Sequence, residues 1–506
     1  MTTLLVNGRI HGGDATALAV TDGLITWLGG DDEGLVRFGD AAVVDVAGGF
    51  VAPAFVDAHV HATSSGLVLA GLDVAGCRSL AECLAALRGF VARRQDNGIV
   101  WGHGWDETAW PEGRPPTRAE VDTAVGDVPV YLSRVDVHSA LVSTALVASA
   151  PDARGVAGWS ADGPISQQAH HHVRGAARAA LTPAGRRTAQ QAFLAHAASL
   201  GVAAVHECAG PDISGTDDLT ELLALSAEGA TPAVVGYWGE RTDPALALEL
   251  GAHGLAGDLF ADGAVGSRTA ALCAPYADDP GNSGAAYLSA DEIAEHVVAC
   301  TRAGVQAGFH VIGDAAVAAL VAGLAAAQTV VGRAALAACR HRVEHLEMVT
   351  ADQAARLGNW GVVGSVQPAF DAAWGGPHGM YARRLGPVRG VALNPFAALA
   401  GHGVTLAFGS DSPVTPVDPW GAVRAAVHHR TPGFGIDPAA AFAAHTAAGW
   451  YAARSTDPGT LTIGAPATYA VWETGDLADG LPALEQRPVC VRTVLRGETI
   501  YDREGT

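Results

Sequence analysis

The chain has 506 residues, of which 49% are hydrophobic, and 31 basic against 52 acidic side chains give it a net charge of −21. This length favours a large body with smaller satellites, and the negative charge argues against nucleic-acid and membrane partners because it repels phosphates and anionic lipids. All 31 basic residues are arginine, which excludes Schiff-base lysine chemistry, a P-loop lysine and any lysine-derived metal ligand.

The two ends of the chain have the same character. Residues 1–50 and 452–506 alternate short β-prone runs, such as TLLVNGRI and CVRTVLRGETIY, with glycine turns. We expect these ends to pair into one small β-sandwich domain that flanks a central body over residues 51–451.

The N-terminal sequence and the cysteines indicate the cellular compartment of the protein. MTTLLVNGRIHGG has neither the basic nor the long apolar region of a secretory signal. The seven cysteines are scattered, without a CxxC pair, in a chain too long to need disulfides. We expect reduced thiols and a cytoplasmic protein.

Between residues 51 and 450 the pattern changes to short apolar runs separated by alanine-rich helical stretches, which is typical of βα units and a parallel sheet. Eight such runs predict an α/β fold with a (β/α)8 TIM-like barrel: residues 51–59, 201–207, 231–238, 257–263, 305–311, 341–347, 361–368 and 404–411.

Two stretches need separate interpretation. The segment between the first and second runs is too long for a simple crossover, so we expect an inserted lobe at about residues 65–185. Ala315–Gly332 carries no charge and is long enough for a membrane span, but it is mostly alanine, and we expect a buried or half-buried helix.

Candidate metal ligands lie at the carboxyl ends of several predicted strands. His59 and His61 lie two residues apart and share one face of a strand. His310, His345 and Asp411 end the fifth, sixth and eighth runs. Because the carboxyl ends of barrel strands meet at one rim, these five side chains converge there.

Imidazole and carboxylate together suit a borderline divalent metal, and we expect zinc, with one or two ions per chain. Such an ion lowers the pKa of a bound water molecule and polarises a carbonyl group. Asp411 is the candidate catalytic residue, which would orient the water, accept its proton and pass that proton to the leaving group.

The order of these blocks resembles the amidohydrolase superfamily, and the wider text is similar to its YtcJ-like branch, amidohydrolase family 3, which includes N-substituted formamide deformylase. The resemblance covers almost the whole chain and is carried by PAFVDAHVH, GHGWDETAWPEGRPPTRAEVD, DLFADGAVGSRTAAL, FHVIGDAA, HRVEHLEMV and FGSDSPV. It implies a distorted barrel with a terminal β-sandwich. It also implies that His59, His61 and Asp411 hold one metal and that His310 and His345 hold a second.

The chain departs from this pattern at one position. Many relatives bridge the two ions with a carboxylated lysine after strand four, where this chain has Asp258. Since aspartate is shorter than lysine, we expect that from the same Cα position it does not reach a midpoint between two ions and that Asp258 lines the pocket. Whether Glu207, Asp258 or only water takes the place of the lysine stays open. Either Glu207 supplies the bridging carboxylate, which makes it a candidate metal ligand, or the site holds a single ion. The neighbouring His206 should then point outward.

On the substrate side, Trp105 in the inserted lobe and Trp238 after the third run would favour an apolar or aromatic group. His138 could donate a hydrogen bond to the substrate, and Arg268 could contact an acidic substituent or brace a loop. The tryptophans could instead merely pack the inserted lobe.

We therefore interpret the sequence as a metal-dependent hydrolase that cleaves an amide or formamide-type C–N bond of a small, apolar or aromatic molecule. The alternatives are an esterase or isomerase on the same scaffold, and a non-catalytic relative that only binds. A homodimer is a common default for such a chain, and the natural substrate stays open.

Overall fold

A computed structural model describes residues 1–94, 98–107, 110–135, 137, 139–211 and 213–504. This part of the chain forms two compact units. The first comprises residues 1–61, 194–211 and 219–506, and the second comprises residues 62–193 and 212–218.

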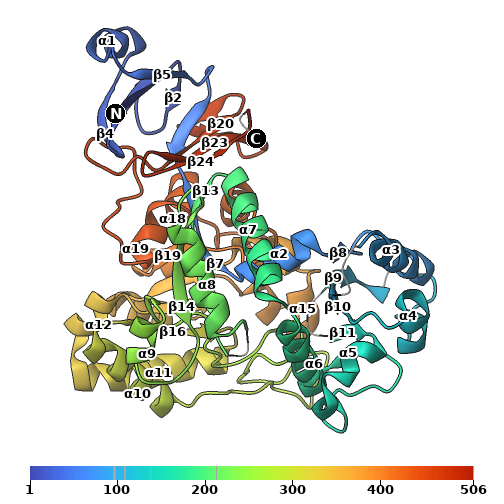
Figure 1. Cartoon of the computed structure of the whole chain (residues 1–506). Coiled ribbons are helices and arrows are strands. Elements are labelled where there is room, and N and C mark those ends of the chain that lie inside the picture. Colours follow the sequence, from blue (N-terminus) through green and yellow to red (C-terminus); the bar gives the residue numbers. More distant parts are fainter. Residues whose placement is uncertain (95–97, 108–109, 136, 138, 212, 505–506) are drawn as a thin grey trace. The chain divides into compact units, whose positions relative to one another are not determined.

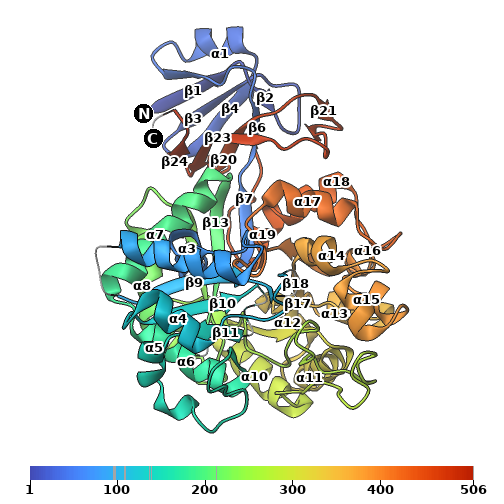
Figure 2. The same cartoon turned by 90° about the vertical axis from the view of Figure 1, so that its right-hand side faces the viewer.

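The first unit contains the predicted barrel (Figures 1 and 2). Eight parallel strands follow one another around it in chain order. The first and last strands meet at a seam, where Asp411 N–H donates to the His59 carbonyl at 2.8 Å and His61 N–H donates to the Ser412 carbonyl at 2.9 Å. The strands are β7 (Phe55–Val60), β13 (Val202–Ala209), β14 (Ala233–Trp238), β15 (Gly254–Leu255), β16 (Gln306–Val311), β17 (Arg342–His345), β18 (Val363–Val366) and β19 (Thr405–Phe408).

The fourth strand corrects the sequence prediction. It is β15, which ends before the predicted run of residues 257–263, because Gly257 has a φ of 79° and turns the chain out of the extended conformation. The chain nevertheless stays beside β16: His310 N–H donates to the Leu259 carbonyl at 2.9 Å, and Ala261 N–H donates to the His310 carbonyl at 3.0 Å.

Helices cover the outside of the barrel strands (Figure 2). They are α8 (Thr216–Ala227), α9 (Ala245–Glu249), α10 (Ala290–Ala303), α11 (Asp314–Val331), α12 (Arg333–Cys339), α13 (Ala351–Asn359), α14 (Pro368–Trp374), α15 (Met380–Leu385), α16 (Phe396–Gly401), α17 (Pro419–Val427), α18 (Pro438–Ala444) and α19 (Ala447–Ala452), with a short 3-10 turn η3 (Arg389–Val391).

Helix α11 contains the long apolar stretch. It is the one helix of the described residues that is long and apolar enough to cross a membrane. Its Leu320 and Leu324 are buried, and at Gly323 it approaches α10 so closely that an added Cβ would lie 2.6 Å from Ile293 Cγ2. One face of α11 is therefore packed against its neighbour, as expected for a half-buried helix.

The two chain ends form the β-sandwich (Figures 1 and 2). One sheet is ordered β4-β3-β1-β5 and the other β2-β6-β20-β23-β24. Their facing side chains share one core, to which Leu18 and Val494 both belong. The elements are β1 (Thr2–Val6), β2 (Arg9–Ile10), β3 (Ala17–Thr21), β4 (Leu24–Gly29), α1 (Asp31–Arg37), β5 (Ala42–Asp45), β6 (Phe50–Pro53), β20 (Tyr469–Glu473), β21 (Leu477–Ala478), β22 (Leu481–Pro482), β23 (Val489–Leu495) and β24 (Glu498–Asp502).

The second unit is the insertion between β7 and β13. It has its own five-stranded sheet, ordered β12-β11-β10-β9-β8, and its own apolar clusters. Its elements are α2 (Ala62–Ala70), β8 (Leu72–Asp73), α3 (Leu80–Arg93), β9 (Val100–Trp105), α4 (Arg118–Val125), β10 (Val130–Arg134), β11 (Ser139–Val142), α5 (Thr144–Ala148), η2 (Pro151–Ala153), β12 (Ile165–Ser166), α6 (Gln167–Ala179) and the first part of α7 (Pro183–Ser199).

Candidate metal centre

The five predicted ligands meet at the carboxyl ends of the barrel strands. His59 and His61 come from the end of β7, His310 lies near the end of β16, His345 ends β17, and Asp411 follows β19. Four of them are buried, and the His61 side chain is 12% exposed. The barrel thus brings together side chains from four separate parts of the sequence.

The first group consists of His59, His61 and Asp411. Asp411 Oδ1 lies 3.4 Å from His59 Nε2 and 3.2 Å from His61 Nε2. Two ligands bound at about 2.0–2.1 Å to one ion, at the tetrahedral angle, lie about 3.3 Å apart. These separations therefore fit donors that share one ion.

Asp258 lies at the centre of the cluster, which corrects the expectation that its side chain is too short to reach between the two sets of candidate ligands. Its Oδ2 is 3.1 Å from His61 Nε2 and 3.5 Å from His59 Nε2. Its Oδ1 is 3.3 Å from His310 Nδ1 and 3.6 Å from His345 Nε2. The prediction was wrong because it assumed a lysine-like Cα position, whereas the chain after β15 runs beside His310.

Glu207, the other candidate bridging ligand, is not grouped with the cluster in the described part of the chain, and its role as a ligand stays a prediction. It is buried on β13, between His206, whose Nδ1 accepts a hydrogen bond from Arg342 at 3.1 Å, and Cys208, whose thiol lies beside the His59 ring. Both neighbours face the barrel interior, so strand alternation directs Glu207 to the opposite face. The described residues whose donor atoms cluster closely enough to hold an ion do not include Glu207. His206 points inward, not outward as predicted.

Three of the four histidines are held with one nitrogen directed at Asp258. His59 Nδ1 donates to Glu344 Oε2 at 2.9 Å, His345 Nδ1 donates to Gln367 Oε1 at 2.7 Å, and His310 Nε2 donates to the Gly263 carbonyl at 3.3 Å. Because each acceptor fixes the proton on one ring nitrogen, the other nitrogen keeps a lone pair for a metal.

Several donor atoms of the cluster are buried without a hydrogen-bond partner in the described chain, namely His59 Nε2, His345 Nε2 and Asp411 Oδ1. Unpaired buried polar atoms are costly and rare in folded proteins. Together with the ring orientations, these atoms show that the residues fit a divalent cation.

The pKa values of the cluster without a bound ion also indicate a site for a cation. Burial alone would raise the pKa of Asp258, but the facing imidazoles outweigh burial and hold that pKa well below its usual range. Burial would lower the pKa of His61, but the facing carboxylates of Asp258 and Asp411 raise it to about 9. A bound cation would take over the role of these protons.

The side-chain directions of His345 and Asp411 depend on an unusual backbone conformation. His345 has a φ of 68° and Asp411 a φ of 53°. Residues other than glycine adopt this left-handed region infrequently, and such conformations are often found at functional sites. On β17, Arg342 and Glu344 both face inward, so the turn at His345 is what brings its ring to Asp258.

A model of the amidohydrolase family matches residues 42–501 of this chain. The chain belongs to the amidohydrolase family. Family membership and the buried cluster of ligand atoms together make it a metal-dependent hydrolase that takes a divalent metal.

Two curated relatives match most of this amidohydrolase. It is 27% identical over 470 residues to protein LONG AFTER FAR-RED 3 of Arabidopsis thaliana, covering 85% of this chain and 78% of the relative. It is 25% identical over 452 residues to YtcJ of Bacillus subtilis strain 168, covering 82% of this chain and 80% of the relative. The YtcJ-like resemblance is thereby confirmed.

Solved structures support the fold. An uncharacterized metal-dependent hydrolase from Pyrococcus furiosus superposes with a TM-score of 0.78 at 26% identity, covering 93% of this chain and 98% of that chain. A second such hydrolase, from Pyrococcus horikoshii OT3, gives 0.79 at 26% identity, covering 96% and 99%.

The predicted substrate-binding residues have local partners in this amidohydrolase. Trp105 Nε1 donates to the Leu132 carbonyl within the second unit, and Trp238 Nε1 donates to Glu240 Oε2. Arg268 forms a two-pronged ion pair with Asp278 at 3.1 and 2.9 Å, which braces a loop. His138 lies outside the described residues. Substrate binding by these four residues stays a prediction.

Sequence reasoning missed an aromatic wall beside the cluster. The Phe370 ring stacks on His345 at 5.9 Å, Trp374 packs on Phe370 at 4.7 Å, and Phe260 lies 4.8 Å from His310. Phe370 and Trp374 lie on α14, just after β18. A helix that directly follows a barrel strand was the signal that could have found them.

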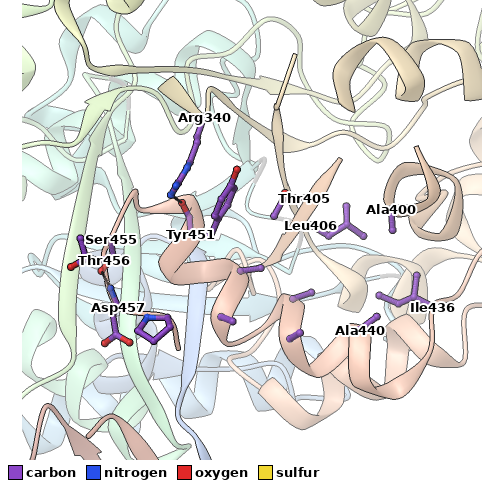
Figure 3. A pocket seen from close by; sticks show the side chains of 15 residues that line it. Arg340, Ala400, Thr405, Leu406, Ile436, Ala440, Tyr451, Ser455, Thr456 and Asp457 are labelled. Atoms are coloured by element: carbon purple, nitrogen blue, oxygen red, sulfur yellow. Dashed lines mark hydrogen bonds between the residues drawn. The ribbon is translucent and has the colours of Figure 1, made fainter. Parts of the chain in front are cut away.

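A pocket of about 600 Å³ lies at the opposite, amino ends of β17 and β19. Figure 3 shows Arg340 reaching toward Tyr451, whose ring centre is 3.8 Å from the guanidinium carbon. Alanines of α18 and α19 line much of the rest, and none of the candidate ligands takes part. Barrel enzymes act at the carboxyl ends of their strands, so this pocket is not the metal centre.

Proposed function

We propose that this amidohydrolase cleaves the C–N bond of an amide or formamide whose substituent is small and apolar or aromatic. The proposal is carried by Asp411, whose Oδ1 has no hydrogen-bond partner among the described residues and faces both His59 and His61 at 3.2–3.4 Å. Imidazole and carboxylate donors support zinc as the ion.

The chemistry follows from this donor set. A divalent ion, when bound, lowers the pKa of a coordinated water molecule and polarises the scissile carbonyl. Asp411 would orient the attacking water, take its proton and return it to the leaving amine. The Asp411 backbone is held at the seam by its 2.8 Å hydrogen bond to the His59 carbonyl, so its carboxylate needs little reorganisation.

The aromatic wall supports the substrate class. Phe370, Trp374 and Phe260 offer apolar surface directly beside His345 and His310, where a substituent next to the scissile bond would lie. Aromatic side chains contribute large apolar contact area, which favours a planar or apolar group.

A cytoplasmic location is part of the proposal. All seven cysteines are free, as expected in a reducing compartment. The net charge of −21 supports a small molecule, and no polyanion, as the partner.

The test is a substrate panel with zinc-loaded protein. N-formyl and N-acyl arylamines are compared with the matching aryl esters, and Asp411→Asn serves as the inactive control. We expect amide turnover that the variant loses. Turnover of esters alone would favour the esterase alternative, and metal-loaded protein without turnover of either class would favour the non-catalytic one.

A further inference from the structure

Asp258 contacts two separate sets of candidate ligands through its two oxygens. Oδ2 faces His59 and His61, whereas Oδ1 faces His310 and His345, with all four separations between 3.1 and 3.6 Å. We propose that Asp258 bridges two divalent ions directly, in the place that a carboxylated lysine takes in many relatives. This inference rests on the proposed function.

The donor count supports two positions. The first gathers His59 Nε2, His61 Nε2, Asp411 Oδ1 and Asp258 Oδ2, and the second gathers His310 Nδ1, His345 Nε2 and Asp258 Oδ1. Three protein donors with an open position are what catalytic sites keep for water or substrate. Without the carboxylate of Asp258, the second position would have two imidazoles and no negative charge.

The short side chain reaches the cluster because the backbone is close to it. At Gly239 an added Cβ would lie 2.8 Å from the Asp258 carbonyl carbon, and at Gly257 it would lie 3.0 Å from Cys208 Cβ. These two glycines therefore let the segment after β15 lie against β13 and β14. The hydrogen bonds of Leu259 and Ala261 to His310 then hold Asp258 beside that ring.

This bridge changes how the centre assembles. A carboxylated lysine forms when its neutral amine attacks carbon dioxide and loses a proton, so its metal loading depends on dissolved carbon dioxide. This chain has no lysine, and Asp258 brings its carboxylate with it. Metal loading of the full chain should therefore be independent of bicarbonate.

The experiment loads the metal-free full chain with Mn²⁺, in carbon dioxide-free buffer and in bicarbonate buffer, and measures bound manganese and its electron paramagnetic resonance spectrum. We expect about two ions per chain with an exchange-coupled signal in both buffers. The Asp258→Asn variant should bind about one uncoupled ion per chain. The control is Asp278→Asn, a matched change on the same loop at a residue that contacts none of the four histidines. It should keep two ions.

One ion in the wild-type chain, coupled ions in Asp258→Asn, or loading that requires bicarbonate would overturn the bridge. If Asp258→Asn does not fold, the ion count and coupling of the wild-type chain decide alone. A wild-type chain that binds no ion would instead refute the metal-dependent function itself, so the two failures are distinguishable.

Discussion

At the scale of single residues, the metal centre rests on a buried ion pair beneath it. Arg342 and Glu344 are fully buried, and the guanidinium bonds both carboxylate oxygens at 2.6 and 3.0 Å. Arg342 also donates to the Ala58 carbonyl and Ser365 Oγ, and its guanidinium carbon lies 4.2 Å from the centre of the Tyr237 ring. Burial would raise the pKa of Glu344, but Arg342 and His59 hold it well below its usual range. Glu344 therefore stays ionised and fixes the His59 tautomer.

Glu344→Gln should weaken metal binding by about 10- to 100-fold, the usual effect of losing such an outer partner. The amide keeps the shape and one acceptor oxygen, but it no longer requires the His59 proton on Nδ1. The measurement is a chelator competition with zinc. Unchanged affinity in a folded variant would show that the Glu344 contact does not position His59.

Residue-scale prediction from the sequence brought together, by residue type and strand-end position, five side chains that the structure also places together: His59, His61, His310, His345 and Asp411. Their role as metal ligands stays a prediction. Sequence prediction failed for Asp258 because side-chain length was weighed without knowing where the backbone runs. Glu207 is not among the described donor groups of the cluster, because His206 and Cys208 on either side of it take the interior face of β13. Glu344 was not singled out in HRVEHLE, because the local sequence does not show that its carboxylate contacts His59.

At the scale of elements, the seam between β7 and β19 controls the position of His59. Gly409 lies just before Asp411, and a Cβ there would lie 2.5 Å from His59 N and 2.7 Å from His59 Cβ. Only glycine, which has no Cβ, allows this approach. The relative positions of His59 and Asp411, at the two ends of the barrel sheet, therefore depend on Gly409.

Gly409→Ala should therefore destabilise the fold by about 1–3 kcal/mol and weaken zinc binding, because β7 must shift. Gly364→Ala on β18 is the matched control, since its nearest neighbour atoms lie at 3.4–3.5 Å in ordinary contact. Urea unfolding and zinc affinity of both variants test this. Equal effects of the two changes would contradict a special role for the seam.

At the scale of the whole molecule, the sandwich and the barrel are packed together. Trp472 of β20 lies 5.7 Å from Phe55 of β7, ring centre to ring centre, and a Cβ on Gly201 would lie 2.2 Å from the Trp472 ring. The sequence predicted both bodies from patterning alone, because strand and helix periodicities are local. It could not place β15, since a two-residue strand ended by one glycine leaves almost no pattern.

Buried histidines away from the metal centre set the acid stability of the barrel. Burial lowers the pKa of His341 to about 3, and of His296 and His445 to about 4. His341 Nδ1 accepts the Ala307 N–H at 2.9 Å, so it must be unprotonated. Above about pH 6.5 these histidines are unprotonated in both the folded and the unfolded chain. Below about pH 6.5 they take up protons in the unfolded chain but stay unprotonated in the folded chain, so the folded state loses stability.

Stability should therefore fall as the pH drops from about 6.5 to about 4 for His296 and His445 and to about 3 for His341, by about 2 kcal/mol per histidine at about pH 5. In His341→Asn the amide oxygen replaces the Nδ1 acceptor but does not titrate. The loss of unfolding free energy between about pH 7.5 and about pH 5 should therefore be about 2 kcal/mol smaller in the variant than in the wild-type chain. Urea unfolding of the metal-free protein measures it. An equal loss in the variant would exclude His341 as a source.

The central claim, that side chains from five barrel strands hold the catalytic metal, is tested most directly by anomalous diffraction from crystals of the zinc-loaded protein. We predict zinc peaks at about 2.0–2.2 Å from the donor atoms of His59, His61, His310, His345, Asp258 and Asp411. Zinc found elsewhere, with no peak among these six side chains, would contradict it.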